Sequence, residues 1–128
     1  MRLMVVFSLL VLLCGGVAAA EDAAALFPKF CEEWMQKLDA RTRDNVSHIK
    51  WETRADGVLG IYVAYSTEHT CETKSGTNSI PIGTITYREV RYERRGSSIP
   101  EAQQNPPNPV ETTEVTEIFR FDKGKWVY

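Results

Sequence analysis

The sequence predicts an α+β domain in which one N-terminal helix packs on a curved antiparallel sheet of four to five strands. Three observations support this fold class. Apolar residues recur at helical spacing from Leu26 to Leu38, and β-branched and aromatic residues separated by turn residues dominate after Asn45. Two cysteines, Cys31 and Cys71, lie one in each region. A disulfide between them would fasten the helix to the sheet.

The first twenty residues have the layout of a secretory signal peptide. Arg2 precedes an apolar run, residues 3–13, which small residues follow as far as Ala20. We expect cleavage before Glu21, which leaves residues 21–128 as one small α+β domain. The run is shorter than the roughly 20 apolar residues that span a bilayer, so we expect no stable membrane span.

The helix is predicted from near Phe27 to near Arg41. Its apolar positions follow the i, i+3, i+4, i+7 spacing of one buried stripe, and Cys31 lies on that stripe. Pro28 is expected in the first turn, where its missing N–H has no helical acceptor. The polar residues between the apolar positions are expected on the solvent side, namely Lys29, Glu32, Glu33, Gln36 and Lys37.

Five strands are predicted after the helix, from β-branched and aromatic runs bounded by turn signals. They cover residues 48–54, 58–70, 84–95, 111–121 and 126–128. Between the third and fourth strands, Ser97 to Pro109 is polar and rich in proline. Such composition predicts a long, mobile loop. A second, shorter loop is expected from Ser75 to Pro81.

The second strand supports the disulfide. Residues two apart along a strand share a face, so Cys71 shares its face with Val63, Ile61 and Leu59. The apolar half of the strand is therefore the half that a bridge to Cys31 would turn toward the helix. Such a bridge persists in the oxidising compartments that exported proteins reach.

The same face selects a register for the first hairpin. A three-residue loop, Ala55 to Gly57, sets Trp51 opposite Ile61, whereas a two-residue loop sets Glu52 there. A slip of one residue exchanges the two faces of a strand. The register with the three-residue loop is therefore expected, because it places the apolar residues of both strands on one face. We therefore expect the indole of Trp51 to lie against the helix.

Arginines and glutamates recur at intervals of three on the two longest later strands. We interpret them as cross-strand pairs that select a register, because glutamates interrupt the arginines and their spacing spreads them over both faces. The expected pairs are Arg94 with Glu111, Arg91 with Glu114 and Arg88 with Glu117. The net charge is −2, so there is no excess of basic residues to attract a nucleic acid, and we expect no nucleic-acid partner.

No constellation identifies a reaction, a metal or a cofactor. Glu68, His69, Cys71 and Glu72 include metal-ligating types, but Glu68 and His69 point to opposite faces of a strand and an oxidised Cys71 is no thiolate ligand. We expect no metal and no catalytic residue. Aromatic and imidazole side chains are the expected ligand contacts, namely Trp51, Tyr62, Tyr65 and His69.

The order of elements resembles the cystatin-like architecture, which cystatins share with the nuclear-transport-factor-2-like superfamily. The ending, Phe119 to Tyr128, is similar to the last hairpin of many domains of that superfamily. Cystatins insert a Gln-x-Val-x-Gly loop into a protease. The corresponding turn here, Ala55 to Gly60, has the valine and the glycine but no glutamine. The resemblance therefore implies the fold and not protease inhibition.

We expect an exported domain, periplasmic or extracellular, that binds a protein partner or a small ligand and catalyses nothing. The ligand site is expected in the groove between helix and sheet or on the outer sheet face that carries Tyr62. Two alternatives stay open. One is an inhibitor of a secreted or periplasmic hydrolase, and the other is a small cone-shaped α+β enzyme that uses Tyr65 and a histidine, His48 or His69. Asn45 heads a glycosylation acceptor triplet and is expected to be exposed.

Loss of either cysteine should prevent stable folding. The bridge closes a loop of about 40 residues, and the chain-entropy model gives it on the order of 4 kcal/mol, comparable with the net stability of a small domain. We expect Cys31→Ser and Cys71→Ser to yield little soluble protein, with any recovered fraction unfolding at lower denaturant concentration. Two variants with the wild-type free energy of unfolding would contradict the bridge.

Overall fold

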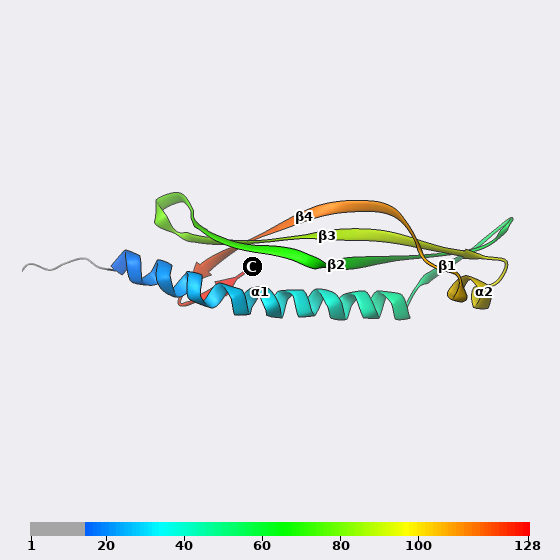
Figure 1. Cartoon of the computed structure of the whole chain (residues 1–128), viewed down its shortest axis with the longest axis horizontal. Helices are drawn as coiled ribbons and strands as arrows, with labels where there is room; N and C mark the ends of the chain where they lie inside the picture. The colour runs from blue at the N-terminus through cyan, green and yellow to red at the C-terminus, as the bar shows by residue number, and fades with distance from the viewer. Residues whose placement is uncertain (1–14) are drawn as a thin grey trace, which may run out of the picture.

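The computed structural model describes residues 15–128 (Figure 1). A long helix, α1 (Gly15–Ser47), precedes five antiparallel strands that neighbour one another in chain order. The strands are β1 (Lys50–Arg54), β2 (Gly57–Ser75), β3 (Pro81–Gly96), β4 (Asn108–Asp122) and β5 (Lys125–Val127). The sheet is curved, and α1 runs along its concave side (Figure 1). The predicted fold class is confirmed.

Helix α1 is longer than predicted at both ends. It begins by Gly15 and ends at Ser47, so Pro28 lies in its interior and not in its first turn. Alanine is the strongest helix former, and the alanine-rich segment that looked like the end of a leader continues the helix. The expected cleavage position before Glu21 falls within α1. Residues 1–14 of the expected leader lie outside the described residues.

Aromatic side chains fix α1 to the far edge of the sheet. The ring centroid of Phe27 lies 4.7 Å from that of Trp126, and those of Phe30 and Trp34 each lie 4.8 Å from that of Phe119. Trp126 also donates its indole N–H to the carbonyl of Ala23 at 2.9 Å. The apolar stripe predicted for the helix therefore packs against β4 and β5.

Along the same buried face, α1 is joined to β2 by the predicted disulfide. Cys31 is bonded to Cys71, with their Cα atoms 6.4 Å apart. Cys31 is 1% exposed, and Ile85, which is opposite Cys71 on β3, is fully buried. The bridge is confirmed, and it lies beside the core that the helix and the middle strands share.

The predicted register of the first hairpin is wrong. Arg54 pairs with Gly57, so the loop holds two residues, and Trp51 lies opposite Gly60. Trp51 therefore shares a face with Gly60 and Tyr62, opposite to the face of Cys71. A Cβ atom at Gly60 would come within 2.6 Å of the Trp51 ring. The indole occupies the room that glycine leaves, which the alternation of apolar residues did not reveal.

The predicted pairing of β3 with β4 is also wrong. The structure sets Arg88 opposite Glu114 and Arg91 opposite Glu111. The predicted register differs by an odd number of residues, so it would turn Ile118 toward the helix in place of Phe119. Burial of Phe119 in the aromatic cluster explains the observed register better than charge pairing does.

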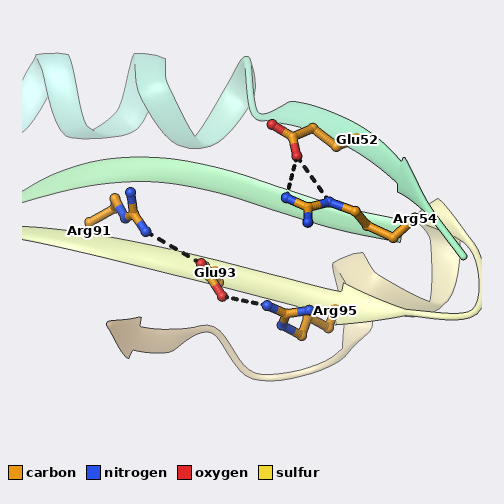
Figure 2. A network of polar contacts seen from close by, with 5 residues as sticks. All are labelled: Glu52, Arg54, Arg91, Glu93 and Arg95. Carbon is orange, nitrogen blue, oxygen red and sulfur yellow. Dashed lines mark hydrogen bonds and ion pairs between the residues drawn. The ribbon is translucent and has the colours of Figure 1, made fainter. Parts of the chain in front are cut away.

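The arginines find partners other than the predicted glutamates. Arg88 pairs with Glu68 at 2.7 Å. Figure 2 shows Glu93 between two arginines of its own strand, at 3.5 Å from Arg91 and 3.0 Å from Arg95. On β1, Arg54 pairs with Glu52 at 2.7 Å (Figure 2). The two pairs whose partners are both exposed, Arg88 with Glu68 and Arg54 with Glu52, each contribute about 1 kcal/mol or less.

The segment predicted as a long mobile loop contains a short helix, α2 (Ile99–Gln104). Ser98 caps its N-terminus by accepting from the N–H of Glu101. Arg94 caps the other end, since its Nη1 donates to the carbonyls of Gln103 and Asn105 at 2.9 and 2.7 Å. The Ser-x-x-Glu capping pattern was present in the sequence and would have indicated this helix.

Gly83 allows β3 to approach α1 closely, because a Cβ atom there would come within 2.3 Å of the Phe27 ring. We expect Gly83→Val to lower the free energy of unfolding by about 1–3 kcal/mol through overpacking, measured by urea denaturation. Thr112→Val, at an exposed position of β4, is the control and should change it by less than about 0.5 kcal/mol. Equal stability of the two variants would show that Phe27 does not fill this space.

Candidate functional site

The principal cavity of the described chain is a groove of about 860 Å³ between α1 and β2. One wall is helical and the other is formed by β2 from Tyr65 to Thr73. Apolar and sulfur-containing side chains line it together with polar ones. The apolar and aromatic contributors are Ala24, Phe27, Pro28, Cys31, Met35, Tyr65 and Cys71. The groove is open to solvent and lies at the place where the sequence predicted a ligand site.

The helical wall is a stripe that sequence reasoning missed. Its members recur every three or four residues and so lie on one side of the helix. Glu32 and Gln36 belong to it, although their polarity had placed them on the solvent side. The complete stripe is Ala24, Pro28, Glu32, Gln36, Asp39 and Arg43. The spacing was visible in the sequence, but a polar stripe that borders a groove has the same pattern as one that faces bulk water.

Pro28 provides the helical wall with a backbone acceptor. Because proline has no N–H, the carbonyl of Ala24, four residues earlier, loses its helical donor. Both residues line the groove. A backbone carbonyl of the helical wall therefore lacks its usual i+4 donor.

The strand wall is an open edge of the sheet. Strand β1 pairs with β2 only as far as Ile61. The next part of the edge is bonded to α1, since the Asn45 Nδ2 donates to the Val63 carbonyl at 2.9 Å and the Tyr65 N–H donates to Thr42 Oγ1 at 3.0 Å. Beyond Tyr65, no strand among residues 15–128 pairs with this side of β2. The edge is therefore open along the groove.

The open edge presents backbone groups at alternate residues. In an antiparallel ladder successive residues direct their N–H and C=O to opposite sides. Tyr65 directs its N–H away from β3, and the register across the bulge gives His69, Cys71 and Thr73 the same alternation. The N–H and C=O groups of these three residues are therefore directed toward the groove side.

A β-bulge shapes the upper part of this wall. The register passes from Tyr65 opposite Glu89 to His69 opposite Tyr87, which leaves Ser66 to Glu68 opposite Arg88 alone. The hydroxyl of Ser66 fills the gap by accepting from the Arg88 N–H at 2.9 Å and donating to the Glu68 carbonyl at 2.8 Å. The bulge bends the strand and separates the helix-bonded edge from the open edge.

Two of the four predicted ligand contacts lie in the groove and two do not. Tyr65 and His69 line it. Trp51 and Tyr62 lie on the opposite face of the sheet, where the Tyr62 ring stacks on Tyr92 with centroids 5.3 Å apart. The structure therefore does not bring the four residues into one site.

Asn45 is not in an exposed linker as the sequence predicted. Helix α1 continues through Ser47, and the half-buried side chain of Asn45 bonds to β2. The amide therefore has a structural role in fastening the end of α1 to β2.

The charges that line the groove are acidic on balance. Asp39 is paired with Arg43 one turn along the helix. Glu32 has no cation within ion-pair distance among residues 15–128. On the opposite wall, His69 Nδ1 lies 2.7 Å from the Thr67 carbonyl, which can only accept, so this nitrogen carries a proton. The uncompensated carboxylate of Glu32 favours a bound cationic group.

Beneath the groove, Tyr87 supports Tyr65. Their rings meet edge to face with centroids 5.9 Å apart, and the Tyr87 hydroxyl donates to Glu117 at 3.1 Å. Burial is the main cause that raises the pKa of Tyr87, and the hydrogen bond to Glu117 raises it further. The phenol is therefore held neutral and serves as a structural donor in the core.

No protein-family model, curated protein or solved structure matches this chain. The function proposed below is therefore argued from the geometry of the groove.

The raised pKa of Tyr87 makes folding sensitive to alkaline pH. The folded state keeps this phenol protonated above the ordinary tyrosine pKa of about 10, so the free energy of unfolding falls as the pH rises past that value. We expect Tyr87→Phe to remove the tyrosine that ionises last in a phenolate-absorbance titration and to flatten the decline in stability. Tyr128→Phe, which alters a tyrosine that is 79% exposed, should leave both features. A titration unchanged by Tyr87→Phe would contradict this assignment.

Proposed function

We propose that the protein is an exported, non-catalytic binding domain that holds an extended segment of a partner protein in the groove between α1 and β2. The observation that carries the proposal is the unpaired edge of β2 along a partly apolar groove. An extended peptide can add to such an edge as a further strand, so that main-chain hydrogen bonds give affinity and side-chain pockets give specificity.

The dimensions and chemistry of the groove favour a short extended peptide. Outward backbone groups at His69, Cys71 and Thr73 match alternate residues of an added strand. Side chains on the inner face of that strand would contact Pro28, Met35 and the disulfide, which favours apolar residues there. On the helical side, the Ala24 carbonyl accepts a donor and Glu32 favours a lysine or arginine.

Export supports a partner outside the cytoplasm. The leader-like segment and the disulfide are typical of periplasmic and extracellular proteins. Among the described residues, no helix is both long enough and apolar enough to cross a membrane. We therefore place the partner in the periplasm or outside the cell.

The alternatives receive less support from the geometry. A hydrolase inhibitor needs a protruding loop that enters an active site, whereas Ser97 to Pro109 is folded onto β3 through α2 and Arg94. An enzyme needs a positioned acid, base or nucleophile. Of the residues considered for that role, Tyr65 packs edge to face on Tyr87, and the two imidazoles each use Nδ1 on a backbone carbonyl, His69 on that of Thr67 and His48 on that of Asp44.

A proline at position 73 tests the proposal directly. Thr73→Pro removes an N–H that faces the groove and leaves the β2–β3 ladder intact, since proline is tolerated at such edge positions. Peptides selected from a random phage-displayed library on the oxidised protein would supply the probe. We expect Thr73→Pro to weaken their binding about fivefold or more, because a backbone hydrogen bond is worth about 1 kcal/mol. Fluorescence anisotropy measures the change.

Matched controls separate this mechanism from general damage. Thr73→Val alters the same side chain but keeps the N–H, so it should retain the affinity. Glu32→Lys should weaken basic peptides, whereas Glu33→Lys, next to it but outside the groove lining, should not. Failure to select any peptide, or equal binding by Thr73→Pro and Thr73→Val, would overturn strand addition at this edge.

A further inference from the structure

Three potential metal ligands meet on the floor of the groove. One ligand atom from each of Cys31, His69 and Cys71 lies within 4.8 Å of the others. The two sulfurs are joined in the oxidised protein, so neither is a thiolate. Reduction of the bridge would leave two thiols and an imidazole nitrogen together at one place.

The imidazole is oriented for such a role by a backbone contact. His69 Nδ1 lies 2.7 Å from the carbonyl of Thr67, and this bond leaves Nε2 with its lone pair when the ring is neutral. Metal-bound histidines almost always donate their other ring N–H in this way, which fixes the ring and raises its basicity as a ligand.

We propose that Cys31, His69 and Cys71 form a binding site for Zn²⁺, or another divalent cation that prefers thiolate and imidazole ligands, when the disulfide is reduced. Zinc takes cysteine sulfur at about 2.3 Å and histidine nitrogen at about 2.0 Å. Ligand atoms that already lie within 4.8 Å of one another need small movements to reach those distances. Three protein ligands leave one of zinc's usual four positions for a water molecule, as in other sites with three protein ligands.

Contacts other than the bridge also place these ligands near one another in the folded chain. Phe27, Phe30 and Trp34 hold α1 on β4 and β5 independently of the bridge. Cys31 lies between them on the helix, and Cys71 and His69 lie two residues apart on β2, on the same face. Both cysteine backbones are therefore placed by contacts that do not involve sulfur.

The oxidised site is open to a reductant. Cys71 is exposed and lines the groove, whereas Cys31 is buried. A thiolate of a dithiol reductant attacks the sulfur of Cys71, the bond to Cys31 breaks, and Cys31 leaves as a thiolate that takes up a proton. The second thiol of the reductant then displaces Cys71. The bridge gains two electrons and two protons, and the reductant becomes a disulfide. Binding of Zn²⁺ afterwards releases the two thiol protons.

Cobalt titration of the reduced protein tests the site. The protein is reduced with a phosphine, freed of reductant without air, and titrated with Co²⁺, whose thiolate complexes absorb characteristically. We expect one equivalent of thiolate-bound Co²⁺, displaced by one equivalent of Zn²⁺. His69→Ala should lower the affinity for Co²⁺ at least about tenfold. Loss of a residue that only hydrogen-bonds to a metal ligand already costs about tenfold or more. His48→Ala, which alters the other histidine, should leave it unchanged, and the oxidised protein should show no thiolate band.

Circular dichroism, recorded at each addition, shows whether the reduced chain is folded. If reduction unfolds the chain, Co²⁺ should restore the helical signal in the wild type and in His48→Ala, and only at higher concentration in His69→Ala. The proposal is overturned if the reduced chain, folded or not, forms no thiolate complex. It is overturned equally if His69→Ala binds Co²⁺ as tightly as the wild type.

Discussion

The fold depends on how α1 is held across the concave side of the sheet. Aromatic contacts attach Phe27, Phe30 and Trp34 to β4 and β5, and on the same buried face of the helix the Cys31–Cys71 bond attaches it to β2. These attachments lie on either side of the buried residues of β3. A domain of this size buries a modest core, so a bridge worth on the order of 4 kcal/mol is a large part of its stability.

The groove follows from the same arrangement. The aromatic contacts draw α1 over the middle and far strands, and β1 ends before it can cover the remainder of β2. Proteins generally protect sheet edges against pairing with other chains. Here Asn45 and Thr42 cover the edge at Val63 and Tyr65, and the bulge distorts it further along. The open part is thus confined to a short stretch beside the helix, which suits recognition of one short segment.

Periodicity predicted the helix face and the five strands, because each depends on the alternation of polar and apolar residues within one segment, and together with the cysteine positions it predicted the disulfide. It did not predict two registers, because these depend on contacts between segments: Gly60 makes room for Trp51 in the first, and burial of Phe119 in the aromatic cluster selects the second. The start of α1 was missed for a different reason, since an alanine-rich segment fits both the end of a leader and a helix. α2 was missed because proline-rich composition was given more weight than the Ser98 and Glu101 capping pattern.

The site could be predicted only in part, because part of it depends on contacts between distant segments of the chain. Tyr65 and His69 were identified because they share a strand face with Cys71, which is a local property. The residues of the helical wall could not be predicted without knowing which side of α1 borders the groove. The distant residues Phe119 and Trp126 fix that side. Since the disulfide forms the floor between the two walls, the partner-binding surface and the sulfur chemistry occupy one place. A change in the oxidation state of the bridge would therefore alter the surface on which a bound strand lies.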